Sequence, residues 1–383
     1  MHDKTVNSVL QGESPVTKAA RALFNQGVTR LYAVSVTCSS TRAPTNTEIR
    51  TALASLAPYA VEGKFDGVIL AGITTASATL VSELNSFANS NNVVYATTHA
   101  AGETVSNIVN QAAALPSGNG IYVAHASTAA SFVADSVHSG EAVGTLIAAQ
   151  TTAFTSEFPH KTGATIVVKV DGTAVASDDY TVTGAIGQIT FDTAPGAGKV
   201  VTCDYTASLP IDDVAASVMG ATMAIKPWNT LFWRAVNTPI STYFTPADMS
   251  TLETAKVNCI HLISSSNRIS NGLTLGGSPK YVDVTRTRYY TALKIRDSVA
   301  ALRLNQMKIP YTKAGIDMVE SAIKQPLEAL IREDAISTYT VVMPVYANIA
   351  AEDRANRVLN GVNVTCQLSG DIQTFNLYLT IAV

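Results

Sequence analysis

The first third of the chain alternates between amphipathic helical segments and short runs that are almost entirely apolar. Helical spacing of apolar residues predicts helices at 15–26, 47–57, 76–89 and 103–114. The runs that follow them read RLYAVSVT, GVILAG, VVYATT and IYVAHA. Strands without polar alternation are typical of a parallel sheet that is covered on both faces. The sequence therefore predicts an N-terminal α/β domain with right-handed crossovers.

Two histidines follow strands of this predicted sheet, where open α/β sheets commonly place their ligand sites. His99 comes after VVYATT and His125 lies within IYVAHAS, with Asp66 or Glu103 as a conceivable acidic partner. The strand-end loops lack GxGxxG, GxxxxGK[ST] and GxSxG, and HExxH is absent. We favour hydrogen-bonded structural histidines and predict no catalytic, cofactor-binding or metal-binding residue. An enzyme with a site near His99 and His125 is kept as an alternative.

From about 160 to 207 the sequence pattern changes from helical to β-rich. Four β-rich runs, separated by turn signals such as Asp171-Gly172, occupy 165–170, 179–183, 188–192 and 199–206. They predict a small antiparallel β-sandwich or barrel. The flanking stretches GEAVGTLIAAQTTAF and DDVAASVMGATMAI are predicted to be helical, so the β segment is interpreted as a domain inserted at the surface. Either it is a passive decoration, or it binds a surface or a glycan, as in an adhesin.

The last third predicts an α+β domain. A helix begins with Thr245 as cap, Pro246 as its first residue and Asp248 in the capping-box position. The strands CIHLIS and YVDVTR follow, then a helix over 286–305, a break at Pro310 and a helix from about 314. The remaining residues are predicted to form antiparallel β-structure. The aromatic residues Trp228, Phe232 and Trp233 are predicted to fill a core or a domain junction.

The chain closes on TFNLYLTIAV, which alternates along its whole length. Phe375, Leu377, Leu379 and Ile381 share one face of the predicted strand. The strand has no proline, lysine or glutamate, the residues that normally protect a free edge. We therefore expect it either to pair inside its own sheet or to recruit another chain.

The composition favours a chain that buries much of its surface in an assembly. Charged residues make up only 14% of the 383 residues, and low charge is unusual for a freely soluble monomer. The net charge of −3 implies no bulk attraction to nucleic acid or to an anionic membrane. No apolar run reaches the roughly 20 residues that span a bilayer, and MHDKTVNSVLQGES lacks the apolar core of a signal peptide. The four cysteines are far apart and are predicted to be buried thiols.

The order of these parts resembles the tail sheath proteins of contractile phage tails and contractile injection systems. The matching stretches are PVTKAARALFNQGVTRLYAVSV, FDGVILAGITT, FTPADMSTLETAKVNCI and YVDVTRTRYYTALKIRDSV. KIPYTKAGIDMVESAI and LSGDIQTFNLYLTIAV resemble the assembly domain of one sheath subgroup. The resemblance covers most of the chain outside 154–207, and its strength lies in the order of the motifs. Many sheaths begin with a long extended arm, whereas only about 13 residues precede the first helix in this sequence.

The resemblance implies a structural role without catalysis or cofactor. It divides the chain into a discontinuous α/β sheath domain (1–153 and 208–257), an inserted surface β domain (154–207) and an assembly domain (258–383). Sheath subunits form stacked hexameric rings around an inner tube, add strands to the sheets of their neighbours, and contract to drive the tube through a target envelope. The implied partners are further copies of the chain, the inner tube protein, and baseplate and tail terminator proteins. The implied location is a virion tail or an injection particle, with no direct nucleic-acid partner and no membrane insertion.

The resemblance also suggests residues with assembly roles. The inter-subunit strand would use Phe375, Leu377, Leu379 and Ile381, unless it is an ordinary internal strand. The candidate residues that face the tube are the basic Lys294, Arg303, Lys308 and Lys313, unless they form a solvated helix face. The candidates for ion pairs between subunits are Arg286 and Arg288.

Overall fold

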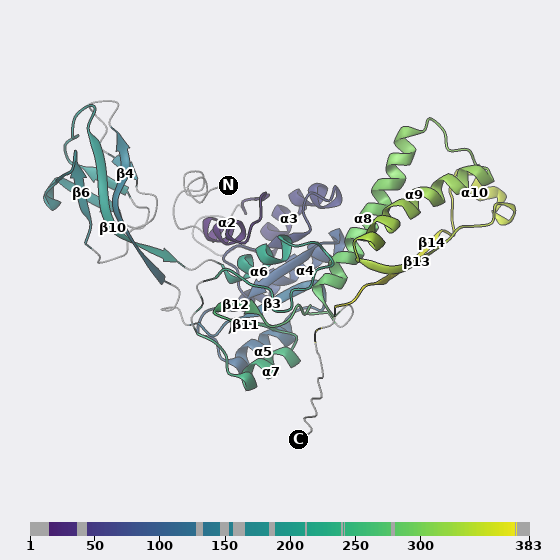
Figure 1. The fold of residues 1–383 in the computed structure, drawn as a ribbon, viewed down its shortest axis with the longest axis horizontal. Coiled ribbons are helices and arrows are strands. Elements are labelled where there is room, and N and C mark those ends of the chain that lie inside the picture. The colour runs from purple at the N-terminus through teal and green to yellow at the C-terminus, as the bar shows by residue number, and fades with distance from the viewer. Residues whose placement is uncertain are drawn as a thin grey trace, which may run out of the picture.

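Figure 1 shows the computed structural model, in which a β-rich module and a helical hairpin lie on opposite sides of a central α/β body. The body takes strands from both the first and the last third of the chain. The residues that the structure describes are 15–36, 44–127, 133–145, 153–155, 165–183, 188–210, 213–238, 240, 242–276, 280–371 and 373.

The body is built on a sheet whose strand order, among the described residues, is β1–β2–β3–β11–β12. The first four strands in this order are parallel, and β12 pairs antiparallel with β11 at one edge. The parallel sheet predicted from the sequence is thus confirmed, and its last two strands come from residues that the sequence pattern assigned to the C-terminal domain. The strands are β1 (Gly67–Ile69), β2 (Val94–Thr98), β3 (Gly120–Ala124), β11 (Asn258–Ile263) and β12 (Ser266–Ile269).

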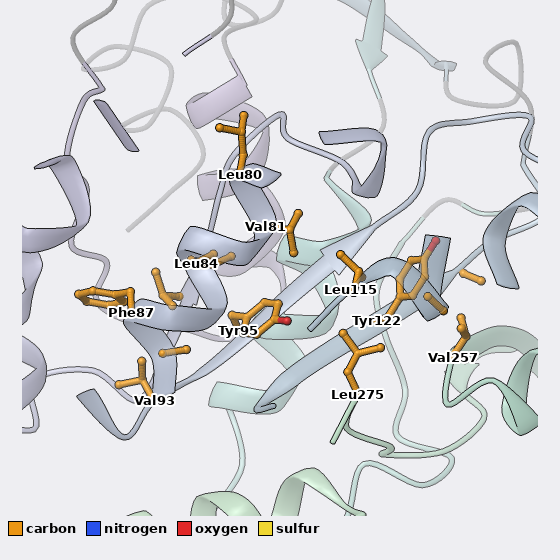
Figure 2. Close-up of a cluster of buried hydrophobic side chains, with 14 of the residues drawn as sticks. Leu80, Val81, Leu84, Phe87, Val93, Tyr95, Leu115, Tyr122, Val257 and Leu275 are labelled. Atoms are coloured by element: carbon orange, nitrogen blue, oxygen red, sulfur yellow. The ribbon is translucent and has the colours of Figure 1, made fainter. Parts of the chain in front are cut away.

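Helices cover both faces of this sheet. One face carries α2 (Pro15–Asn25) and α6 (Val214–Met223), and the other carries α3 (Asn46–Val61), α4 (Ala78–Asn91), α5 (Val105–Ala114) and α7 (Pro246–Thr254). Successive residues of β2 enter different cores, because strand side chains alternate. Tyr95 lies with Leu84 and Phe87 of α4, as Figure 2 shows, whereas Val94 and Ala96 lie in the core of α2 and α6. None of the described helices is long and apolar enough to cross a membrane.

The β module consists of two antiparallel sheets, which confirms the predicted β-structure. The sheets are β4 (Val133–Thr145), β10 (Val200–Pro210), β6 (Val167–Val170) and β7 (Thr173–Ala174) in one, and β5 (Ala153–Thr155), β9 (Gln188–Phe191) and β8 (Tyr180–Thr183) in the other. Phe154, Ile189 and Cys203 are among the buried residues between them. Burial raises the pKa of the Cys203 thiol to about 12, as it does for Cys259 in the body, so both are the buried, protonated thiols predicted.

The helix predicted over GEAVGTLIAAQTTAF is wrong at both ends, because 140–145 belong to strand β4 and its last two residues belong to β5 (Ala153–Thr155). Thr145 and Gly144 pair with Val200 and Val201 of β10. Glycine is a poor helix-interior residue, and Gly140 has a positive φ of 66°. Pairing with β10 therefore outweighs the local alanine content, and the β-structure begins by residue 133.

The last third forms a helical hairpin followed by a β-ribbon, as predicted after the break at Pro310. Its elements are α8 (Val282–Asn305), α9 (Lys313–Arg332), β13 (Ile336–Val342), η5 (Tyr346–Asn348), α10 (Ala351–Ala355) and β14 (Asn363–Leu368).

The strand predicted over YVDVTR is wrong, since α8 already begins at Val282. Threonine normally disfavours a helix interior because its β-branch restricts χ1. Here Thr285, Thr287 and Thr291 each donate a hydroxyl hydrogen bond to the carbonyl four residues earlier, at 3.3, 2.6 and 2.8 Å. These bonds satisfy buried hydroxyl groups, which lets the β-branched side chains pack against the body.

The apolar run RLYAVSVT does not form the predicted strand in its described part, residues 30–36. Tyr32 packs against the rings of Tyr59 and Phe65, with ring centres 5.5 and 6.1 Å apart. This aromatic contact places Tyr32 beside the end of α3. Leu31 and Val34 remain more than one-third exposed, at 37% and 36%.

Polar side chains fix α7 and the strand that follows it. Thr245 and Asp248 form the predicted capping box, with the Asp248 N–H donating to the Thr245 hydroxyl at 3.2 Å. Asn258, the first residue of β11, is fully buried. Its Nδ2 donates to the carbonyls of Tyr122 and Leu273 at 3.1 and 2.9 Å, and its Oδ1 accepts from the Leu273 N–H at 2.8 Å. One amide thus joins β3, β11 and the loop after β12.

We predict that Asn258→Ala lowers the free energy of unfolding by at least about 2 kcal/mol, because buried backbone groups lose their partners. Urea unfolding followed by circular dichroism measures this loss. The matched control is Asn107→Ala, whose exposed amide bonds only to Glu103 and which should change stability by less than about 0.5 kcal/mol. Equal losses in the two variants would contradict the role assigned to Asn258.

Candidate functional site

The helical hairpin is anchored to the body by a buried arginine in the second turn of α8. Arg286 is 4% exposed, and its Nε and Nη2 donate to the Asp66 carboxylate at 3.2 and 2.9 Å. Its guanidinium also donates to the carbonyls of Thr222 and Ile225 at 2.7 and 3.3 Å. The sequence suggested Arg286 for an ion pair between subunits, but its guanidinium is occupied by partners of its own chain. Arg288 is exposed and lies over the Tyr289 ring, 5.8 Å from its centre.

The next two turns of α8 continue this contact. The Tyr289 hydroxyl accepts a hydrogen bond from Asn119, and Arg296 donates to the carbonyl of Val61 at the end of α3. Leu293 lies so close to Gly63 that a Cβ there would sit 2.5 Å from its Cδ2, and Gly63 also has a positive φ of 68°. The first half of α8 is therefore held along the body, and the second half projects from it with α9 (Figure 1).

Helix α9 is amphipathic and covers one face of the β13–β14 ribbon. Its buried residues Ile323, Leu327 and Leu330 share a core with the inward side chains of the ribbon, including Tyr339 and Val364. The Ser298 hydroxyl of α8 donates to the Ala322 carbonyl of α9 at 2.7 Å, which joins the two helices. The hairpin and the ribbon thus form one packed unit.

The ribbon consists of the two strands β13 and β14. In the part of the chain that the structure describes, β13 and β14 pair only with each other. A two-stranded ribbon is marginal on its own, and its outer edges carry backbone groups that are able to pair with a further strand. Val342 at the end of β13 and Val345 just after it are 54% and 64% exposed. This surface fits a strand from another segment or chain. The predicted inter-subunit strand, with Phe375, Leu377, Leu379 and Ile381, lies outside the described residues.

The tip of the hairpin combines positive charge with exposed apolar side chains. Arg303, Lys308 and Lys313, three of the four basic residues predicted to face a tube, are exposed at the turn between α8 and α9. Leu304 and Met307 beside them are 85% and 102% exposed. Behind them, an open groove of about 810 Å³ runs between the two helices. The sequence predicted the basic residues of this surface but not its apolar pair, which lies at a helix end shortly before Pro310.

Lys294, the fourth basic residue, lies nearer the root of the hairpin. Its ammonium group is 5.1 Å from the centre of the Tyr290 ring, and this ring contacts Trp228 edge-on. The Lys226 ammonium group lies over the Trp228 ring and donates a hydrogen bond to the Glu333 carboxylate at 2.6 Å. Trp228 therefore fills a junction between body and hairpin, as the sequence predicted, and Lys294 packs against that junction.

His99 and His125 lie together, as expected from their strand-end positions, but in a buried stack. Their ring centres are 4.3 Å apart, and both side chains are at most 3% exposed. His99 Nδ1 lies 2.6 Å from the Ala100 carbonyl, and its Nε2 accepts from the His125 backbone N–H at 3.1 Å. Only the neutral ring with its proton on Nδ1 makes both bonds. Asp66 and Glu103, the considered acidic partners, instead accept hydrogen bonds from Arg286 and Asn107.

The charge state of this pair suits a structural role. Burial lowers the pKa of both histidines, to about 3 for His125, where the neighbouring His99 adds to the effect. Both rings are therefore neutral near pH 7. Among the described residues, no group of three or more His, Cys, Asp or Glu side chains is arranged to hold a metal ion.

Comparison with solved structures identifies the fold. A chain of the sheath complex of an extracellular contractile injection system, PVC, in its contracted state superimposes with a TM-score of 0.58 at 12% identity, covering 97% of this chain and 82% of that chain. A chain of the anti-feeding prophage baseplate gives 0.57 at 13% identity with the same coverages. The contracted helical sheath of the anti-feeding prophage gives 0.53 at 14% identity, covering 95% and 81%. No protein-family model and no curated relative matches the sequence. The predicted resemblance to contractile sheath proteins is confirmed at the level of the fold.

We predict that the buried histidines make the protein less stable in mild acid. Between pH 6.5, the ordinary histidine pKa, and the lowered pKa of about 3, the unfolded chain binds a proton that folded His125 does not bind. The free energy of unfolding should therefore fall as pH drops below 6.5, by up to about 1.4 kcal/mol per pH unit for each such histidine. Urea titrations at pH 6.5 and 5 measure the slope.

His125→Gln should reduce this slope, because glutamine does not titrate and the backbone N–H that bonds to His99 is kept. His261→Gln is the matched control, since that side chain is less buried and should matter less. An unchanged slope in His125→Gln would show that His125 titrates normally in the folded protein.

Proposed function

We propose that the protein is a structural subunit of a contractile sheath. It polymerises as stacked hexameric rings around an inner tube, and it contracts to drive the tube through a target envelope. The observation that carries this proposal is the fold likeness to chains of contractile injection assemblies over 95–97% of the chain. Its packed elements, rather than a catalytic centre, would perform the work. The stacked, neutral histidines fit this structural role.

Subunits are linked, in this proposal, by strand addition to the β13–β14 ribbon. The ribbon offers open edges in the described part of the chain, and α9 already covers its inner face. The terminal strand supplies the partner, because it alternates and lacks the residues that would repel other chains. Backbone hydrogen bonds then give affinity, while the connecting segments remain free to bend. Head-to-tail contacts form a ring where the rotation between subunits closes and a helical polymer where it does not, so contacts of both kinds build stacked rings.

The hairpin tip faces the tube in the proposed assembly. Arg303, Lys308 and Lys313 present positive charge beside the exposed Leu304 and Met307, which suits an acidic partner with an apolar centre. The β module lies on the opposite side of the body (Figure 1), so it would point outward. Baseplate and terminator proteins would cap the ends of the polymer. The assembled protein would reside in a virion tail or an extracellular injection particle.

The purified full-length chain is predicted to form tubes or stacked rings that negative-stain electron microscopy detects. Leu377→Asp with Leu379→Asp should abolish them, because two charges on the apolar face oppose burial in a neighbouring sheet. The matched control is Asn376→Asp with Thr380→Asp, which places the same charges on the opposite face and should reduce assembly less. A wild-type protein that stays a monodisperse monomer under all conditions would refute the proposal.

Charge reversal at the tip is predicted to separate tube binding from sheath formation. Lys308→Glu with Lys313→Glu should lower co-sedimentation with the inner tube protein at least about tenfold at low salt, and should leave sheath polymers intact. Arg30→Glu with Lys64→Glu, at exposed positions of the body, is the control. Tube binding that survives the tip reversal unchanged would show that another surface faces the tube.

A further inference from the structure

A stacked aromatic pair, half-buried Phe232 and exposed Trp233, lies on the loop between α6 and α7. The rings of Phe232 and Trp233 stack with their centres 4.8 Å apart and an angle of 16° between them. Trp233 is 50% exposed, so the prediction that all three aromatic residues of this loop fill a core or junction is wrong for it. We call Phe232 and Trp233 the aromatic ledge.

The backbone of the ledge is clamped in an unusual conformation. Trp233 has a positive φ of 54°, which is rare for a bulky side chain. Its N–H donates to the Ile269 carbonyl at 3.0 Å, and its carbonyl accepts from Arg268 Nη1 at 2.8 Å. Both partners belong to β12, so the edge of the sheet holds the strained residue in place. Strained residues that their surroundings enforce in this way often serve a function.

The C-terminal segment starts directly beside the ledge. The Thr230 hydroxyl accepts from the Phe232 N–H at 3.1 Å and also from Gln373 Nε2 at 3.4 Å. One hydroxyl thus joins the ledge to the root of the terminal strand. An extended residue spans about 3.3 Å, so the two-residue step from Gln373 to Phe375 reaches at most about 7 Å. Residues 374–383 themselves lie outside the described part.

We propose that in the unassembled subunit the apolar face of the chain's own terminal strand packs against the aromatic ledge. Phe375 is the first side chain of the strand to contact it. The tether makes docking intramolecular, with an effective concentration in the millimolar range. Stacked aromatic rings favour a further aromatic side chain at their edge or face. Docking covers a strand that otherwise recruits other chains. Binding of the terminal strand to the aromatic ledge therefore slows assembly before the strand is needed for it. This consequence rests on the proposed sheath function.

Fluorescence of Trp233 in the unassembled subunit tests whether the terminal strand packs against the aromatic ledge. The chain has two tryptophans, so Trp228→Phe leaves Trp233 as the reporter and keeps an aromatic ring against Tyr290. In dilute full-length protein carrying this change, adding Phe375→Ala should raise the acrylamide quenching constant about twofold and shift the emission to the red. Tyr378→Ala, on the other face of the strand, is the matched control and should change neither quantity.

Two outcomes of this experiment overturn the proposal. Equal quenching with and without Phe375→Ala shows that the strand does not cover Trp233. Protection that increases with protein concentration shows that a second copy, rather than the chain's own strand, occupies the ledge.

Polymerisation kinetics test separately whether binding of the terminal strand to the aromatic ledge slows assembly. Trp233→Ala should shorten the lag of tube formation severalfold and leave the final amount of polymer unchanged, as measured by light scattering and electron microscopy. A longer lag or a loss of polymer would mean that the ledge is a contact within the polymer, which contradicts restraint. If the wild-type chain never polymerises, the sheath proposal fails. The fluorescence result still decides whether the terminal strand packs against the aromatic ledge.

Discussion

The buried guanidinium of Arg286 is the interaction on which the arrangement of the molecule depends. It joins the start of α8 to the residue before β1 and to the end of α6, three segments that are distant in sequence. Charge-assisted hydrogen bonds of this kind are short and directional, and a buried arginine deprived of its partner is costly. The hairpin, its tip and the ribbon therefore keep a defined position relative to the body. In a sheath, force applied at the tip would reach the body through this contact.

The structure separates rigid parts from surfaces that await partners. The body buries two cores on either side of one sheet, and the buried Asn258 amide is hydrogen-bonded within the chain. Among the described residues, the ribbon pairs with no further strand, and the hairpin tip exposes Leu304 and Met307. Exposed apolar surface and unpaired edges are unfavourable in an isolated monomer. Their position away from the body core fits a subunit that completes its surfaces only in a polymer.

Sequence periodicity predicted most of the body, apart from the strand expected over RLYAVSVT, because the body's strands and helices follow local patterns that burial reinforces. It failed where a distant partner decides the structure. Residues 140–145 look helical but pair with β10, and the threonines of YVDVTR look like strand residues but bond within α8. Arg286 was suggested for an ion pair between subunits, since nothing local reveals that Asp66, 220 residues earlier, pairs with it. The exposure of Trp233 likewise depends on its clamp to β12. The fold likeness was recognised from the order of motifs, whereas the surfaces for partners required the three-dimensional arrangement.

The central claim is that subunits join by adding the terminal strand of one chain to the β13–β14 ribbon of another. A cryo-electron-microscopy reconstruction of the polymer, at a resolution that traces the backbone, tests it most directly. The account predicts that residues 375–383 of each subunit run as a strand along an outer edge of the neighbour's ribbon. A reconstruction in which these residues pair only within their own subunit, with both ribbon edges free of neighbouring chains, would contradict it.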